Sequence, residues 1–174
     1  MNLVRSLNWI LTYKCNCQCL HCDIGGLGSN LSFSISDVRQ VLADPLIEKS
    51  YRHYGKKFDI SLGGGEPFLL ADLQDIVDEI EGKFPGSFKC ITTNGLLKAK
   101  TVKFVSKNKN LDFKINVSLD GLAKVHDKIR GIKGAFNKTL KTILEVKSTK
   151  PRQEIEIKLT VSPLNYDQII NIYK

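Results

Sequence analysis

The stretch Cys15-Asn16-Cys17-Gln18-Cys19-Leu20-His21-Cys22 contains four of the five cysteines of the chain. With Cys17 set aside, the other three follow the spacing Cys-x3-Cys-x2-Cys. Such soft thiolate ligands favour zinc or an iron–sulfur cluster. A structural zinc ion usually has four protein ligands, and a [4Fe–4S] cluster usually has four cysteines. Because this spacing supplies three, a cluster held here would leave one iron free to bind a small molecule.

The spacing alone leaves two other interpretations of the cysteines open. A zinc knuckle could draw on five nearby side chains: Cys15, Cys17, Cys19, His21 and Cys22. A disulfide framework is disfavoured, because the number of cysteines is odd and we find no secretory segment before them. Cys17 is either an alternative ligand or a bystander. Cys90 stands alone in a predicted strand, and we expect it to be a small buried apolar residue.

Composition indicates an ordinary globular chain. Of its 174 residues, 42% are hydrophobic and 25% are charged, so we expect one domain over residues 1–174. The sequence has no apolar run of about 18 residues, and we therefore expect no membrane span. Residues 1–6 lack the apolar core of a signal peptide. Reduced cysteines without an export signal favour a cytoplasmic location.

The net charge of +8 could attract an acidic partner. The lysines are dispersed, however, with mild concentrations at residues 98–109 and 138–152. The chain has no arginine-rich run and no interleaved aromatic residues of the kind that stack on nucleic-acid bases. Dispersed lysine usually keeps a surface solvated, so we expect no nucleic-acid partner.

Apolar patterning predicts alternating strands and helices. The predicted strands cover residues 3–13, 58–62, 88–93, 113–119 and 154–161. The predicted helices cover residues 34–44, 71–80, a short stretch around 102–105, 135–146 and 164–174. Ser34 or Ser36 would cap the first helix and Asn165 the last. Pro45 should end the first helix near Asp44, with the polar stretch 48–57 leading out of it. The glycine run at 25–30 is predicted to be a connector.

The strand–helix order predicts an α/β fold with a parallel sheet and helices outside it. Distinctive residues follow three of the strands: Gly63-Gly64-Gly65-Glu66-Pro67, Thr92-Thr93-Asn94-Gly95 and Ser118-Leu119-Asp120-Gly121. Ligand residues at the carboxyl ends of parallel strands are typical of βα barrels. Glycine has no Cβ, so the pair in the first of these motifs would let the backbone approach a ligand closely.

Taken together and in this order, these motifs resemble those of the radical S-adenosylmethionine (radical SAM) family. Cys15-x3-Cys19-x2-Cys22 is similar to its cluster loop, with His21 where the family often has an aromatic residue. The resemblance implies a [4Fe–4S] cluster on Cys15, Cys19 and Cys22, whose open iron chelates the amino and carboxylate groups of SAM. The reduced cluster then cleaves SAM to methionine and a 5′-deoxyadenosyl radical, which abstracts hydrogen from a substrate.

The resemblance also implies that eight residues bind the cofactor: Gly64, Gly65, Glu66, Thr93, Asn94, Ser118, Asp120 and Arg130. Residues 64–67 are similar to the family's GGEP motif, which receives the amino group of SAM. Ser118 and Arg130 would approach the SAM carboxylate. Asp120 is expected to form a turn or to lie near the ribose. His126 is expected to have a structural role at the start of a helix.

Residues 118–136 most resemble a subgroup that contains peptide-maturing, sulfatase-maturing and molybdopterin-precursor enzymes. This subgroup implies a ribosomal peptide as substrate, with a purine- or tetrapyrrole-type small molecule as the alternative. It also implies an electron donor such as flavodoxin or ferredoxin. The resemblance covers nearly the whole chain, but the family's partial (βα) TIM-like barrel usually has six units and this sequence shows about five. We therefore expect a fragment of a longer protein, or a short member that completes its barrel with another chain. A non-catalytic metal- or cluster-bearing binding module is the alternative from another class.

Overall fold

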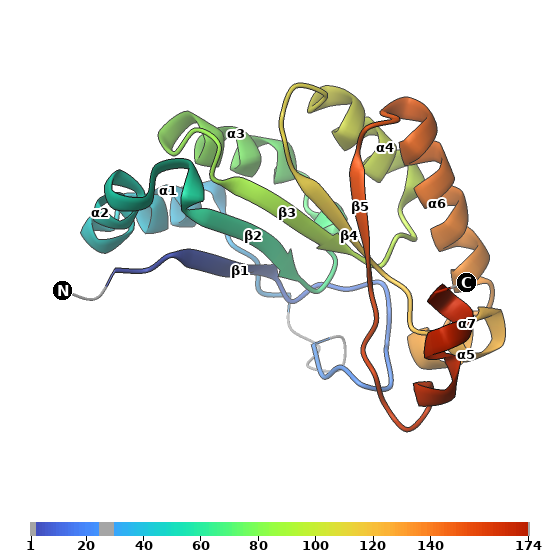
Figure 1. Cartoon of the computed structure of the whole chain (residues 1–174). Helices are drawn as coiled ribbons and strands as arrows, with labels where there is room; N and C mark the ends of the chain where they lie inside the picture. The colour runs from blue at the N-terminus through green and yellow to red at the C-terminus, as the bar shows by residue number, and fades with distance from the viewer. Residues whose placement is uncertain (1–2, 25–29, 174) are drawn as a thin grey trace.

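The chain folds as one sheet of five parallel strands in the order β1-β2-β3-β4-β5 (Figure 1). The computed structural model describes residues 3–24 and 30–173, so most of the predicted glycine connector lies outside the described residues. The strands are β1 (Ser6–Thr12), β2 (Asp59–Gly64), β3 (Phe88–Thr93), β4 (Lys114–Ser118) and β5 (Glu154–Lys158). This arrangement confirms the predicted α/β fold, an open partial barrel of parallel strands.

Helices follow the strands and cover one face of the sheet. They are α1 (Ile35–Leu42), α2 (Pro45–Tyr54), α3 (Leu73–Lys83), α4 (Lys98–Lys107), α5 (Ala123–Arg130), α6 (Ala135–Thr149) and α7 (Ile169–Tyr173). Short 3₁₀ helices are η1 (Gly55–Lys57), η2 (Pro67–Leu69) and η3 (Tyr166–Gln168). Helix α1 packs on α3, and α4 packs on α6 (Figure 1). Within the described residues, no helix is both long and apolar enough to span a membrane.

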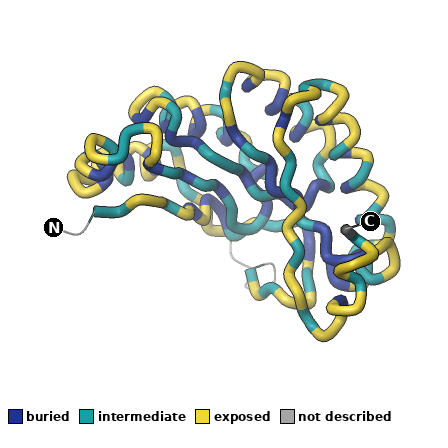
Figure 2. Tube along the Cα trace, viewed as in Figure 1, coloured by how far each residue is buried: buried dark blue, intermediate teal, exposed yellow. Residues whose placement is uncertain are grey.

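The two faces of the sheet differ in character. Toward the helices, alternate strand residues are fully buried in the core (Figure 2): Ile60, Leu62, Ile91 and Ile115. The other face is polar, and Ser61, Cys90, Lys114 and Glu154 are aligned across it from β2 to β5. Cys90 is only partly buried and accepts a hydrogen bond from Asn116 Nδ2 at 3.3 Å. The prediction of a buried apolar cysteine was therefore wrong, because Cys90 points to the polar face.

Residues 34–54 form two helices where the sequence predicted one helix and a polar exit. The Ser34 hydroxyl accepts from Asp37 N, and the Asp37 carboxylate accepts from Ser34 N, so Ser34 caps α1. Asp44 then caps a second helix, α2, whose first residue is Pro45. Proline suits a first helical turn because the N–H that it lacks has no partner there. The predicted polar stretch is therefore largely helix α2.

The C-terminal half also departs from the prediction in two places. Helix α5 was not among the predicted helical ranges, and His126, which was expected at the start of a helix, lies inside it. Asn165 precedes η3, but its side chain makes no capping bond there. It accepts from Ser162 N at 2.7 Å and donates to the carbonyl of Asp120 at 2.8 Å. The buried amide therefore connects the segment after β5 to the end of β4.

The glycines after β2 let two backbone segments lie almost in contact. Gly65 N donates to the Thr12 carbonyl at 2.7 Å, and Glu66 N donates to the Lys14 carbonyl at 2.8 Å. A Cβ on Gly65 would overlap the Lys14 carbonyl oxygen, and Gly64 has a φ of +118°. The glycine pair was expected to admit a ligand. Its tightest contact is instead with the chain that leads into the cysteine loop.

A Gly65→Ala variant should therefore be destabilised, because the added methyl group displaces the backbone of Lys14. We expect a loss of about 1–3 kcal/mol in the free energy of unfolding, as for overpacked cores. Gly63→Ala is the matched control, since a Cβ there meets nothing closer than the Thr92 Cβ at 3.9 Å. Anaerobic urea unfolding measures both. Equal stability of the two variants would contradict the proposed steric role of Gly65.

Candidate functional site

A cavity of about 350 Å³ lies at the carboxyl ends of the strands, beside the loop that follows β1. One wall is the cysteine loop, with Cys15, Cys17, Cys19 and Cys22. His21 and Ile24 of the same loop also line the cavity. The rest of the lining comes from Arg130 of α5 and from residues at the other strand ends: Gly64, Gly65, Thr92, Thr93, Asn94, Ser118 and Thr160. The structure thus brings together nine of the eleven predicted site residues. The side chains of Glu66 and Asp120 are fully buried beside this cavity and do not line it.

The cysteine loop is attached to the end of β3 and to the end of α5, and it contains a turn of its own. Cys22 N donates to the carbonyl of Cys19 at 3.1 Å, which closes a turn between these two cysteines. Asn94 Nδ2, after β3, donates to Asn16 Oδ1 at 2.6 Å. Leu20 N donates to the carbonyl of Ile129 at 2.9 Å, near the end of α5. The residue after β3 and the last turn of α5 therefore fix the loop in place.

The four thiols of the loop are not equivalent. Cys17 is buried and lies between Cys15 and Cys19. Its thiol hydrogen-bonds to both sulfurs and, as the largest cause, lowers the pKa of Cys15 and of Cys19 to about 6. The same hydrogen bonds, with burial, raise the pKa of Cys17 itself. Cys15 and Cys19 are thus mainly thiolates at neutral pH, while Cys17 stays protonated as a donor.

These residues fit a metal–sulfur group with a small polar ligand. The thiolate is the form of cysteine that binds metals, and all four loop cysteines are free of disulfides. The cavity volume lies within the range of roughly 300–1,000 Å³ that is common for small-ligand sites. Arg130 Nε, at the cavity, is buried and has no hydrogen-bond partner among the described residues. Among the described residues, no three His, Cys, Asp or Glu side chains are grouped as ligands of a single metal ion.

Glu66 joins the ends of two strands below the cavity. Its carboxylate accepts hydrogen bonds from the Thr93 hydroxyl at 2.8 Å, Asn94 N at 2.8 Å and Phe68 N at 3.2 Å. Burial raises the pKa of Glu66 to about 7, although these three donors act in the opposite direction. The side chain therefore holds the end of β3 against the end of β2, which positions Thr93 and Asn94 at the cavity.

Asp120 and Arg130 form a buried ion pair next to the cysteines. Arg130 Nη2 lies 2.7 Å from Asp120 Oδ2, and Arg130 Nη1 donates to Cys19 Sγ at 3.4 Å. Asp120 Oδ1 accepts from Thr160 N at 3.2 Å. Asp120 N donates to Nδ1 of the buried His126, and burial lowers the pKa of this histidine to about 4. His126 therefore has a structural role, as expected, but it acts from inside α5 by orienting the turn after β4.

Among the residues at the site that were not predicted from the sequence are Asn16, Thr160 and Asn165. Asn16 lies within the cysteine motif, and its polar side chain was the one available signal. Thr160 contributes its backbone N–H, and Asn165 contributes a contact formed across 45 residues of chain. Neither contact can be predicted from the local sequence pattern, because each joins residues that lie far apart in the chain.

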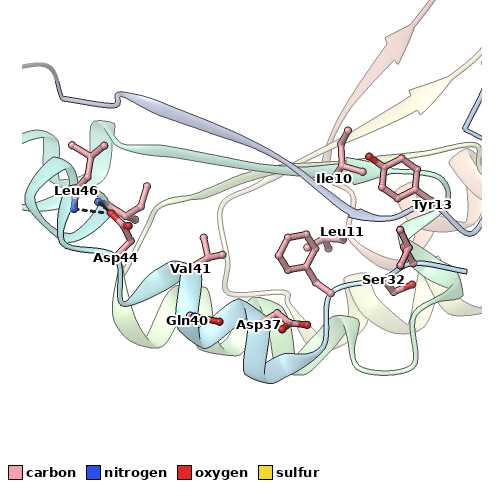
Figure 3. A pocket seen from close by; sticks show the side chains of 12 residues that line it. Ile10, Leu11, Tyr13, Ser32, Asp37, Gln40, Val41, Asp44 and Leu46 are labelled. Atoms are coloured by element: carbon pink, nitrogen blue, oxygen red, sulfur yellow. Dashed lines mark hydrogen bonds between the residues drawn. The ribbon is translucent and has the colours of Figure 1, made fainter. Parts of the chain in front are cut away.

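A larger cavity, of about 740 Å³, lies beside β1 (Figure 3). Its lining is mainly apolar and includes Ile10, Leu11 and Val41. Asp44 also lines it, but its carboxylate accepts from Leu46 N in the helix cap (Figure 3). No cysteine lines this cavity. The smaller, thiol-lined cavity is therefore the candidate site.

A parallel α/β sheet with a thiol-lined cavity at its strand ends defines a cofactor-binding partial barrel. Residues 9–174 match the protein family described as the Radical SAM superfamily. The chain therefore belongs to the radical SAM superfamily, which is the family that the motifs resemble.

Two curated relatives illustrate the sequence similarity. The mycofactocin maturase MftC of Mycolicibacterium smegmatis is 30% identical over 165 residues, which is 94% of this chain and 39% of the relative. The Fe-coproporphyrin III synthase of Methanosarcina barkeri is 31% identical over 134 residues, which is 76% of this chain and 31% of the relative. The chain thus spans well under half the length of these two relatives.

Solved structures share the fold. The structure of anSMEcpe with bound AdoMet has a TM-score of 0.71 at 22% identity, over 99% of this chain and 47% of that one. Streptococcus suis SuiB bound to the precursor peptide SuiA has a TM-score of 0.69 at 20% identity, over 98% of this chain and 36% of that one. At these identities the similarity establishes the fold alone.

The raised pKa of Glu66 predicts a pH dependence of stability. Because the folded carboxyl has a pKa of about 7 against an ordinary 4.5, the folded state binds its proton more tightly than the unfolded state. This contribution is fully present below pH about 4.5 and is lost as the pH rises through 7.

We expect the free-energy difference between wild type and Glu66→Gln to fall by about 2 kcal/mol from pH 5 to 8, at ~1.4 kcal/mol per pKa unit. Subtracting the free energy of unfolding of the variant from that of wild type removes the contribution of groups that titrate equally in both, such as histidines far from Glu66. Anaerobic denaturant unfolding across this range measures the difference. A constant or rising difference would show that Glu66 is ionised in the folded state throughout.

Proposed function

We propose that this chain is the core of a radical SAM enzyme, with a [4Fe–4S] cluster on Cys15, Cys19 and Cys22 and with SAM in the adjoining cavity. The observation that supports the proposal is the cavity itself, which places these three free cysteines opposite the polar strand ends. When bound and reduced, the cluster would supply the electron that cleaves SAM to a 5′-deoxyadenosyl radical, the step that cofactor chemistry contributes.

The chain's own residues would bind and orient the cofactor. Arg130 and Ser118 line one side of the cavity, where a guanidinium and a hydroxyl suit a carboxylate. Gly64 and Gly65 line another side, and backbone oxygens there would accept hydrogen bonds from an ammonium group. Thr93 and Asn94 would line the rest of the SAM pocket. Asp120 would contribute through Arg130, because its carboxylate is buried away from the cavity.

The substrate that we propose is a ribosomally made peptide. Support comes from relatives and structural neighbours: MftC is a maturase, SuiB was solved with a precursor peptide, and anSMEcpe was solved with peptides. A small molecule of purine or tetrapyrrole type is the second candidate. The relatives named as GTP 3′,8-cyclases and as Fe-coproporphyrin III synthase favour it.

A reductant must deliver the electron, and we propose a small acidic carrier such as flavodoxin or ferredoxin. The net charge of +8 favours association with an acidic protein. We also propose that residues 1–174 form one domain and that the protein works in the cytoplasm, where its free thiols would stay reduced. A binding module without catalysis would share the charge and the metal, but it would not cleave SAM.

Anaerobic reconstitution tests the cluster assignment. Wild type should bind about four irons per chain, show the broad absorption of a cubane, and release 5′-deoxyadenosine from SAM under reducing conditions. Cys22→Ala should lose the cubane signal and the cleavage. Cys90→Ala is the matched control, and Cys17→Ala should also keep the cluster, because its thiol acts as a donor.

A protein that binds only zinc would refute the proposed function, and so would a Cys22→Ala variant that keeps an intact cluster. A cluster-bearing wild type that never cleaves SAM would instead favour the non-catalytic binding module.

SAM affinity tests the pocket separately from the cluster. Ser118→Ala in the reconstituted protein should weaken SAM binding by about tenfold, the usual effect of losing one hydrogen bond to a charged group. Ser106→Ala, on the exposed surface of α4, is the control and should bind normally. Equilibrium dialysis with labelled SAM gives both constants. If both variants bind equally well, Ser118 does not contact the cofactor.

A further inference from the structure

Arg130 is the side chain that connects the cysteine loop to the end of β4. Helix α5 brings it there, since Leu20 N donates to the Ile129 carbonyl at 2.9 Å, immediately before Arg130. Gly131 follows with a φ of +69°, and a Cβ on it would lie only 3.1 Å from the Gln18 carbonyl oxygen. The end of α5 is therefore packed directly on the loop that carries Cys19.

Asp120 is the carboxylate that lies against the guanidinium of Arg130. The pair is almost fully buried, with side-chain exposures of 9% for Arg130 and 0% for Asp120. One carboxylate oxygen contacts Arg130, and the other accepts from Thr160 N. The backbone of Asp120 is fixed as well, by His126 at its N–H and by Asn165 at its carbonyl. Arg130 thus lies between Cys19 and a carboxylate whose backbone is held by hydrogen bonds on both sides.

This geometry has an electrostatic consequence for any cluster on the loop. A reduced cluster carries one more negative charge than an oxidised one, so a nearby cation favours reduction. Hydrogen bonds to ligand sulfurs and local charge are established determinants of cluster potential. Arg130 Nη1 supplies both at Cys19 Sγ. The carboxylate of Asp120, which contacts the other terminal nitrogen, Nη2, offsets part of the positive charge.

We propose that Arg130 is a positioning residue for Cys19 that raises the reduction potential of the cluster, and that Asp120 both orients Arg130 and lowers this potential. The inference rests on the proposed function, since it takes Cys19 as a cluster ligand. This role of Arg130 is separate from its proposed binding of the SAM carboxylate, because it affects the cluster before SAM binds.

The test is a redox titration of the reconstituted full chain without SAM, followed by electron paramagnetic resonance. Arg130→Gln should favour the oxidised cluster and lower the potential. Asp120→Asn keeps the shape of the side chain and should raise the potential. We expect each change to alter the ratio of reduced to oxidised cluster by about tenfold, which is about 59 mV for one electron. Lys128→Gln removes a charge from the exposed face of α5 and is the matched control.

Arg130→Lys is the second variant, because it keeps the charge and removes the planar fork. If Arg130→Gln cannot hold a cluster, Arg130→Lys should restore it with a potential close to that of wild type. The inference would be overturned if the reduction potential shifted in the same direction in Arg130→Gln and Asp120→Asn, or if these shifts were no larger than the shift in Lys128→Gln. It would also be overturned if a folded Asp120→Asn variant lost the cluster. A wild type without a cubane would instead refute the proposed function.

Discussion

The contact between the backbones after β1 and β2 is the constraint on which the site depends. Two hydrogen bonds, from Gly65 N and Glu66 N, hold the chain after β1 against the second strand end. This contact requires glycine, because any side chain at Gly65 would occupy the space of the Lys14 carbonyl. It brings the cysteine loop across the ends of the strands. The polar residues at the other strand ends can then face the thiols.

The two buried carboxylates near the cavity connect neighbouring elements of the fold. Glu66 ties β2 to β3, and Asp120 ties β4 to α5 and to the segment after β5. Buried carboxylates of this kind are costly unless they are well hydrogen-bonded. Both are therefore better understood as fixed supports for their neighbours than as groups that meet a ligand. They explain how a shallow site on an open sheet keeps a defined geometry.

Much of this structure follows from local sequence. Strand–helix alternation gives the parallel sheet, and motif position gives nine of the cavity residues. What could not be predicted depends on contacts between distant segments. The function of Asp120 requires knowing that Arg130 and Thr160 meet it. Helix α5 was missed because it is only eight residues long and has two large apolar residues, Val125 and Ile129. Helix α2 was missed because Pro45 was interpreted as a terminator and not as a first residue.

The open sheet leaves β1 and β5 as edge strands, each paired with one neighbour in the described sheet. Unpaired edges invite self-association between molecules. Strand β5 carries Glu154, Glu156 and Lys158 on one side, and Lys114 bridges the two glutamates. These charged side chains lie on the polar face, whereas Ile157 on the other side of β5 is 43% exposed. Lys114 therefore joins β4 to β5 on the polar face alone, and the last described strand has two chemically different sides.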